Sequence, residues 1–108
     1  MGKSRRLLLL GAAAAVLPLR AQPSEAQVEI RDMKFSPEVL NVKIGTTVRW
    51  TNNERRTSHS VIFLAPLAFE SDRIFPGESW QYRFEHAGSF PYSCGPHPEM
   101  KGRIEVTP

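Results

Sequence analysis

Short segments of alternating apolar and polar residues constrain most strongly how this chain can fold. In residues 27–108 apolar side chains recur at every second position, as in Leu40, Val42 and Ile44, and this period is typical of a half-buried β-strand. Turn residues such as Pro76-Gly77 end the segments. This region shows no helical period with capping residues. We therefore predict an all-β fold, a Greek-key antiparallel β-sandwich of about seven to eight short strands.

The same alternation predicts the hydrophobic core. One face of each strand carries aliphatic or aromatic side chains that can pack between two sheets. The segment 65–77 lacks a clear period, and we expect it to be irregular. The predicted core consists of Val28, Ile30, Leu40, Val42, Val48, Trp50, Val61, Phe63, Trp80, Tyr82, Phe84, Phe90, Tyr92, Ile104 and Val106.

The N-terminal segment has the features of a secretory leader. Basic residues precede an uncharged apolar run, residues 7–19, which is shorter than the ~20 residues that a membrane span needs. Adjacent arginines before leucines resemble a twin-arginine signal. We predict a signal peptide at residues 1–26, of Sec or twin-arginine type. Cleavage after Ala26 is preferred, because small residues occupy the positions before it, and cleavage after Ala21 is the alternative. The domain at residues 27–108 is then expected in the periplasm.

The charge balance argues against nucleic-acid binding. The whole chain carries a net charge of +3, from 14 basic and 11 acidic residues. The leader holds four of the basic residues and one of the acidic residues, which is also a net of +3. Ten residues of each sign remain, so the domain has no basic excess. We expect a monomer without a membrane span or a nucleic-acid partner.

One short run carries most of the chemistry of the chain: Cys94-Gly95-Pro96-His97-Pro98-Glu99-Met100. It contains the only cysteine, a histidine three positions later and a methionine three positions after that. Thiolate, imidazole and a weak thioether are ligands that a redox-active copper ion accepts. A single cysteine cannot form an internal disulfide, and a metal would both cap the thiol and join distant segments. We therefore predict a site for one copper ion.

A further ligand must come from another part of the chain. His59 lies at the start of a predicted strand, after a polar loop, so it can face the cysteine loop at one end of a sandwich. The other candidate, His86, lies in a predicted turn. We therefore predict His59, Cys94, His97 and Met100 as the metal ligands.

Other chemistries fit the run less well. A structural zinc site seldom uses methionine, and iron–sulfur clusters need more cysteines. A nucleophilic pair of Cys94 and His97 lacks an acidic residue to orient the imidazole. Two alternatives to a copper shuttle stay open. One is a copper-delivery protein or copper enzyme component with an open coordination position, and the other is a binding module in which the run is a coincidence.

Prolines stiffen the loop around the second histidine. Pro96 and Pro98 restrict the backbone on both sides of His97. Ligands held in one geometry favour electron transfer, because the metal then rearranges little between oxidation states. The prolines have no amide hydrogen, so positions 96 and 98 cannot donate a hydrogen bond to the Cys94 sulfur, whereas Gly95 can. Such hydrogen bonds tune the redox potential.

Three segments of the chain resemble the cupredoxins, the small type 1 or blue copper proteins. The spacing of two residues between His97 and Met100 resembles that of the amicyanins, whereas plastocyanins and pseudoazurins space these residues more widely. The segments are Met33-Lys34-Phe35 with Pro37-Glu38, Val48 to Asn53 with His59-Ser60-Val61, and Phe90 to Gly102.

The resemblance implies a function as well as a fold. It implies a plane of His59, Cys94 and His97 around one type 1 copper ion, with Met100 as the axial ligand. The protein would be an electron carrier rather than an enzyme. It would dock transiently with redox partners, and the amicyanin pattern suggests an amine dehydrogenase and a c-type cytochrome.

Three residues depart from the family pattern. Ser60 follows the first histidine, where the family usually has an asparagine that links the two ligand loops. Ser58 stands where proline is common, and Gly95 stands where a hydroxyl residue usually follows the cysteine. These positions surround the ligands and influence the redox potential, while the four ligands themselves are unchanged.

Overall fold

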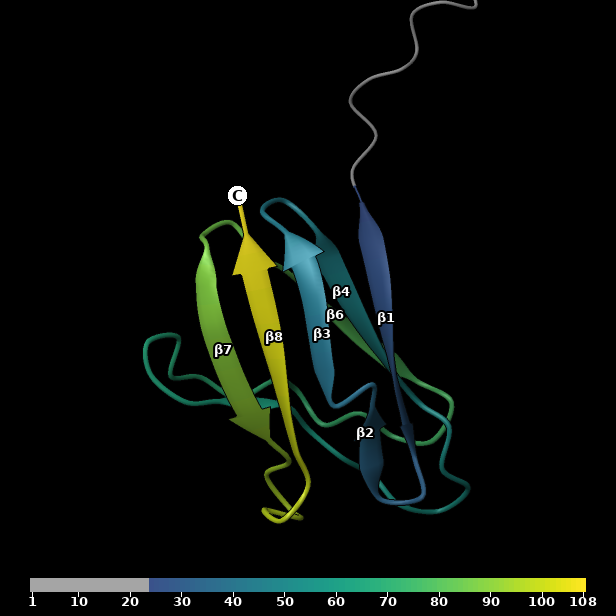
Figure 1. The fold of residues 1–108 in the computed structure, drawn as a ribbon. Coiled ribbons are helices and arrows are strands. Elements are labelled where there is room, and N and C mark those ends of the chain that lie inside the picture. The colour runs from purple at the N-terminus through teal and green to yellow at the C-terminus, as the bar shows by residue number, and fades with distance from the viewer. Residues whose placement is uncertain (1–23) are drawn as a thin grey trace, which may run out of the picture.

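The computed structural model describes residues 24–108, which form two β-sheets packed face to face (Figure 1). These residues contain strands but no helix, and therefore no helix of the length and apolarity that a membrane span requires. The all-β prediction is confirmed. The strands are β1 (Glu25–Arg31), β2 (Lys34–Ser36), β3 (Val39–Lys43), β4 (Thr47–Asn52), β5 (Ile62–Phe63), β6 (Ser79–Arg83), β7 (Gly88–Ser93) and β8 (Lys101–Thr107).

The order of the strands confirms the predicted sandwich. One sheet has the order β2-β1-β4-β6 and the other has the order β3-β8-β7-β5. Each strand from β3 to β7 lies in the sheet opposite to that of the strand before it. The connections therefore cross between the sheets at the two ends of the sandwich, and the loops that collect there can meet.

Two strand pairs are parallel, which corrects the prediction of purely antiparallel sheets. β1 runs parallel to β4, with Val28 opposite Trp50, and β3 runs parallel to β8, with Val42 opposite Val106. The other four pairs are antiparallel. Side chains alternate between the two faces in either kind of pair, so the periodicity of the sequence carries no information about strand direction.

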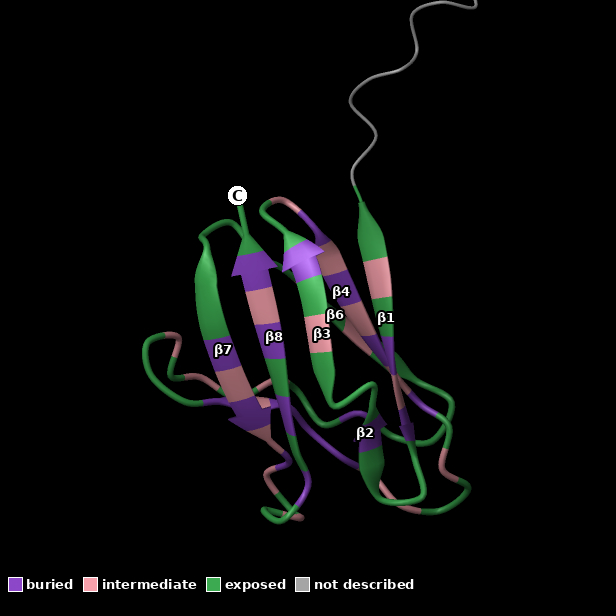
Figure 2. Cartoon of the chain, in the orientation of Figure 1, coloured by how far each residue is buried: buried purple, intermediate pink, exposed green. Residues whose placement is uncertain are grey.

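Aromatic side chains from both sheets fill the space between them. The ring of Phe63 in β5 lies 5.8 Å from that of Tyr82 and 5.9 Å from that of Phe84, measured between centroids. Trp50 of β4 meets Tyr92 of β7 edge-on at 5.5 Å. Figure 2 shows the corresponding alternation of buried and more exposed residues along β4, β7 and β8. Such aromatic pairs stabilise the contact between the sheets beyond the area that they bury.

Most of the predicted core is buried, and the exceptions lie at the sheet edges. Leu40, Trp80 and Tyr82 pack against the core but are only half-buried, because β3 and β6 are edge strands. Phe35 and Ile74 are buried although the alternation did not predict them.

The first strand begins inside the predicted leader. Most of the predicted signal peptide, residues 1–23, lies outside the described residues. Ala26 belongs to β1 and lies opposite Val48 of β4. Cleavage after Ala21 would leave β1 whole, whereas cleavage after Ala26 would remove its first two residues.

Candidate metal centre

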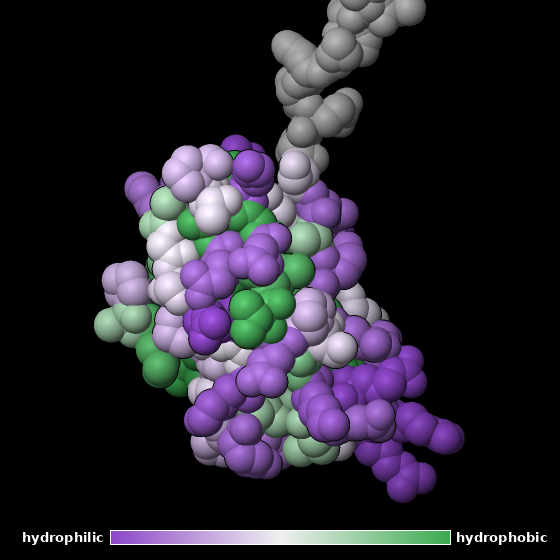
Figure 3. Space-filling view, viewed as in Figure 1, coloured by the Kyte–Doolittle hydropathy of each residue, from purple (hydrophilic) through white to green (hydrophobic). Residues whose placement is uncertain are grey.

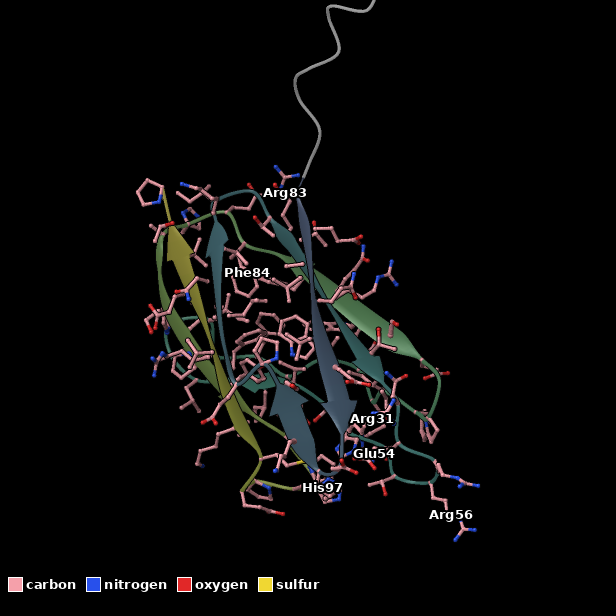
Figure 4. The ribbon with its side chains drawn as sticks, turned by 45° about the vertical axis from the view of Figure 1, so that its right-hand side comes forward. Arg31, Glu54, Arg56, Arg83, Phe84 and His97 are labelled. Carbon is pink, nitrogen blue, oxygen red and sulfur yellow. The ribbon has the colours of Figure 1, made fainter. Side chains whose placement is uncertain are left out.

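The predicted ligands meet at one end of the sandwich. Figure 4 shows His97 and Glu54 at the same end of the molecule, far from Arg83 at the other end. His97 lies in the loop between β7 and β8, and Glu54 lies in the polar loop that leads from β4 to His59. Strongly hydrophilic side chains extend beyond the body at the lower right of Figure 3, on the side where Figure 4 labels Arg56.

The side chains of three predicted ligands lie close together. Cys94 Sγ lies 3.5 Å from His59 Nδ1 and 3.6 Å from His97 Nδ1, and one ligand atom from each residue falls within 4.8 Å of the other two. An ion about 2.0 Å from an imidazole nitrogen and about 2.3 Å from a thiolate keeps those atoms about 3.5–3.7 Å apart at angles between tetrahedral and trigonal. The spacing therefore fits a single metal ion.

Backbone hydrogen bonds close the loop that carries Met100. The Met100 amide donates to the His97 carbonyl at 2.9 Å, and the Cys94 amide donates to the Met100 carbonyl at 3.1 Å. Met100 is 3% exposed. It thus completes a cluster of two histidines, a cysteine and a methionine.

A buried asparagine and a buried isoleucine position His59. The His59 and Ile74 backbones exchange two hydrogen bonds, of 3.0 and 2.7 Å. The Asn52 side-chain amide donates to the Ile74 carbonyl at 2.9 Å and to the Thr57 carbonyl at 2.8 Å, and its oxygen accepts from the Glu54 amide at 2.8 Å. Neither residue was predicted to act at the site, because Asn52 resembles an ordinary turn residue and Ile74 lies in a segment without a period.

The predicted ligands differ in their access to solvent. His59 and Cys94 are fully buried. His97 is partly exposed and stands between the exposed residues Pro96 and Pro98. Among the four predicted ligands, His97 is therefore the one that reaches the surface.

Burial controls the protonation of the cluster. It lowers the pKa of His59, and the nearby His97 lowers that pKa further, while Glu54 opposes the shift. The Glu54 Oε2 lies 3.6 Å from His59 Nε2. Burial also raises the pKa of the Cys94 thiol, although hydrogen bonds to the sulfur act in the other direction. The metal-free site thus favours a neutral imidazole and a thiol, and a metal must displace the thiol proton.

The loop of the first histidine supplies a hydrogen bond to the sulfur that was not predicted. The Ser60 amide donates to Cys94 Sγ at 3.4 Å. The Gly95 amide, which the sequence left free to donate to the sulfur, donates to Ser60 Oγ at 3.0 Å. Ser60 Oγ in turn donates to Glu70 Oε2 at 2.7 Å.

The third histidine lies outside the cluster. His86 is exposed and lies between β6 and β7. The group of three that could hold a metal ion, among the described residues, consists of His59, Cys94 and His97. The structure thus brings together the residues that the sequence singled out and keeps the rejected candidate apart from them.

The whole domain matches a known family. A family model described as a cupredoxin-like domain matches residues 6–106. The chain belongs to the cupredoxin family.

Relatives and solved structures agree with this assignment. This cupredoxin is 33% identical to amicyanin-alpha of Methylorubrum extorquens over 101 residues, which cover 90% of this chain and 84% of the relative. The solved Cu(I) form of an amicyanin mutant superposes with a TM-score of 0.72 at 32% identity and covers 82% of this chain and 86% of that chain. A copper-containing nitrite reductase of Thermus scotoductus also matches, with a TM-score of 0.73 at 28% identity, over 83% of this chain and 23% of that chain.

The donor set of this cupredoxin fits copper. One thiol, two imidazoles and one thioether form an amicyanin-like cluster, and a plane of two histidines and a cysteine with a distant methionine is typical of blue-copper electron-transfer sites. The Cys94 sulfur lies 3.5 and 3.6 Å from the two Nδ1 atoms, and the three residues could hold one metal ion between them.

Proposed function

We propose that this cupredoxin is a periplasmic one-electron carrier. His59, Cys94 and His97 would bind one copper ion in a plane, with Met100 as the weak axial ligand. The observation that carries the proposal is the convergence of Cys94 Sγ and two imidazole Nδ1 atoms at 3.5 and 3.6 Å. When bound, copper would supply the Cu(I)/Cu(II) couple.

The chain itself restrains the ligands. Pro96 and Pro98 limit the backbone around His97, and the hydrogen bond from the Cys94 amide to the Met100 carbonyl closes the loop. Ligands restrained in this way change little between oxidation states. A site of this kind suits rapid gain and loss of an electron.

Partners would approach at His97. This ligand is partly exposed between two exposed prolines, so a small and transient contact can bring a partner close to the site. An amine dehydrogenase as donor and a c-type cytochrome as acceptor are the partners that we propose for this monomer.

Copper delivery or catalysis is the second candidate function. The similarity to part of a nitrite reductase supports it, because the same fold there belongs to an enzyme. All four ligand roles are filled in this cluster, however, and a substrate would need an open coordination position. The carrier is therefore the better proposal.

Export is part of the proposal. We propose that the leader is removed after Ala21, because β1 begins at Glu25 and the Ser24 carbonyl accepts a hydrogen bond from the Thr47 amide at 3.0 Å. Mass spectrometry of the protein from a periplasmic extract tests this. A mature chain that begins after Ala26, or a full-length chain that stays in the cytoplasm, would contradict it.

Copper titration tests the electron-carrier function. The carrier should bind one copper per chain and show an intense blue thiolate band, and this band should vanish on reduction and return on oxidation without loss of metal. A Cys94→Ser variant should lack the band while its circular dichroism stays that of a β-protein. A colourless copper form, or release of copper on reduction, would favour delivery instead.

A further inference from the structure

The segment between β5 and β6 holds a carboxylate beside the two ligand loops. The Phe63 amide donates to the Phe69 carbonyl, and the Ser71 amide donates to the Val61 carbonyl, each at 2.8 Å. These bonds join the residues on both sides of Glu70 to β5 and to Val61, the residue just before β5. The position of the Glu70 side chain is therefore set by the sandwich and not by a free loop.

Hydrogen bonds connect Glu70 to both ligand loops. Ser60 Oγ donates to Glu70 Oε2 at 2.7 Å and accepts from the Gly95 amide at 3.0 Å. A hydroxyl has one hydrogen, so donation to Glu70 turns the oxygen lone pairs towards other donors, here Gly95. Through its own amide, Ser60 also donates to Cys94 Sγ at 3.4 Å. Ser60, which directly follows His59, is thus hydrogen-bonded both to the Cys94 sulfur and to the amide of the next residue, Gly95.

The Glu70 carboxylate also explains why position 95 is a glycine. A Cβ at Gly95 would overlap Glu70 Oε2 and would lie 2.7 Å from Ser60 Oγ. The φ angle of Gly95 is not in the left-handed region that favours glycine, so the turn itself does not require it. Glu70 and Ser60 occupy the space that a side chain would need.

We propose that Glu70 is a positioning residue for the metal site. Its carboxylate orients the Ser60 hydroxyl, which holds the Gly95 amide and fixes the start of the loop from Cys94 to Met100. The network then consists of Ser60, Glu70 and Gly95. Glu70 orients the Ser60 hydroxyl, the hydroxyl holds the Gly95 amide, and the two side chains leave room only for a glycine at position 95. The copper measurements rest on the proposed function, whereas the hydrogen-exchange measurement below does not.

Hydrogen exchange in the copper-free protein tests the network without metal. Glu70→Ala should make the Gly95 amide exchange about tenfold faster, since a hydrogen bond to a charged group contributes enough to slow exchange by that factor. Glu70→Gln keeps an acceptor oxygen but loses the charge, so the exchange rate should rise by a smaller factor, about two- to fivefold. Asp72→Ala, which removes an exposed acidic residue of the same segment, should leave the rate unchanged.

A pair of substitutions tests the spatial argument. Gly95→Ala should weaken copper binding, and Glu70→Ala added to it should restore affinity by about tenfold, because the overlapping carboxylate is gone. Asp72→Ala added to Gly95→Ala should restore nothing. Should Gly95→Ala not fold, Glu70→Ala is expected to restore folding.

The outcomes separate this proposal from the proposed function. Unchanged exchange at Gly95 in Glu70→Ala, or simple additivity of Gly95→Ala and Glu70→Ala, would overturn the role of Glu70. If the parent protein takes up no copper, the proposed function fails, while the exchange rates still decide the role of Glu70.

Discussion

Replacing Gly102 by alanine is predicted to destabilise this cupredoxin, although alanine normally suits a strand better than glycine. Gly102 of β8 lies opposite Tyr92 of β7. A Cβ at Gly102 would overlap Cζ of the Tyr92 ring and lie 2.5 Å from its hydroxyl oxygen. The backbone of Gly102 is not in the left-handed region, so packing alone decides the effect.

The magnitude follows from two opposing contributions. Removing a glycine from a strand interior gains about 0.5–1 kcal/mol of unfolding free energy. The Tyr92 ring cannot move aside, because its centroid lies 4.8 Å from that of Phe35, 5.5 Å from that of Trp50 and 5.7 Å from that of Phe63. Forcing a methyl group into such a core costs about 1–3 kcal/mol. We expect a net loss of about 1–2 kcal/mol from a total of about 5–10 kcal/mol.

Urea unfolding of the metal-free protein measures this loss. The midpoint of Gly102→Ala should fall while the m-value stays unchanged. Tyr92→Leu should relieve the overlap, so the double variant should be more stable than the sum of the single effects predicts. A Gly102→Ala protein as stable as the parent, or more stable, would refute the packing argument.

Three further results are expected. The pKa of His59 is lowered in the folded protein, so as the pH falls the imidazole of the unfolded chain takes up a proton before that of the folded chain. The metal-free protein should therefore lose stability below about pH 6.5, by up to about 1.4 kcal/mol per pH unit. Urea unfolding at several pH values measures this change of unfolding free energy with pH. The same change in a His59→Gln variant would show that His59 is not its cause. Burial raises the pKa of Cys94, so copper uptake at neutral pH should release about one proton. Calorimetry in buffers of different ionisation enthalpy measures this release. A heat of copper binding that is the same in every buffer would show that no proton is released. Asn52→Ala should cost about 2–4 kcal/mol and weaken copper binding, because it removes three hydrogen bonds of a buried side chain, to the Ile74 carbonyl, the Thr57 carbonyl and the Glu54 amide. The exposed Asn53→Ala is the control, and equal effects of the two substitutions would refute this role.

The strands were predictable because side-chain alternation is a local property. Val48 and Trp50 share a face in any strand, whatever lies beside it, and both are fully buried. Which strands form the edges depends on contacts between distant segments. Leu40 and Trp80 therefore alternate correctly and yet are only half-buried.

The ligand cluster was predictable in part for a similar reason. Cys94 and His97 lie in one short loop, so their spacing alone indicates a site. His59 could be proposed only together with a fold that brings its segment to the same end. Asn52 and Glu70 act through tertiary hydrogen bonds to backbone amides, carbonyls and a hydroxyl, and no spacing of residue types in the sequence marks such a role.

Anomalous diffraction at the copper edge, from crystals of the copper-loaded protein, tests the central claim most directly. We predict one peak per chain, within bonding distance of His59 Nδ1, His97 Nδ1 and Cys94 Sγ, with the Met100 sulfur further away. A peak elsewhere on the surface, or no peak in crystals grown with stoichiometric copper, would contradict the account.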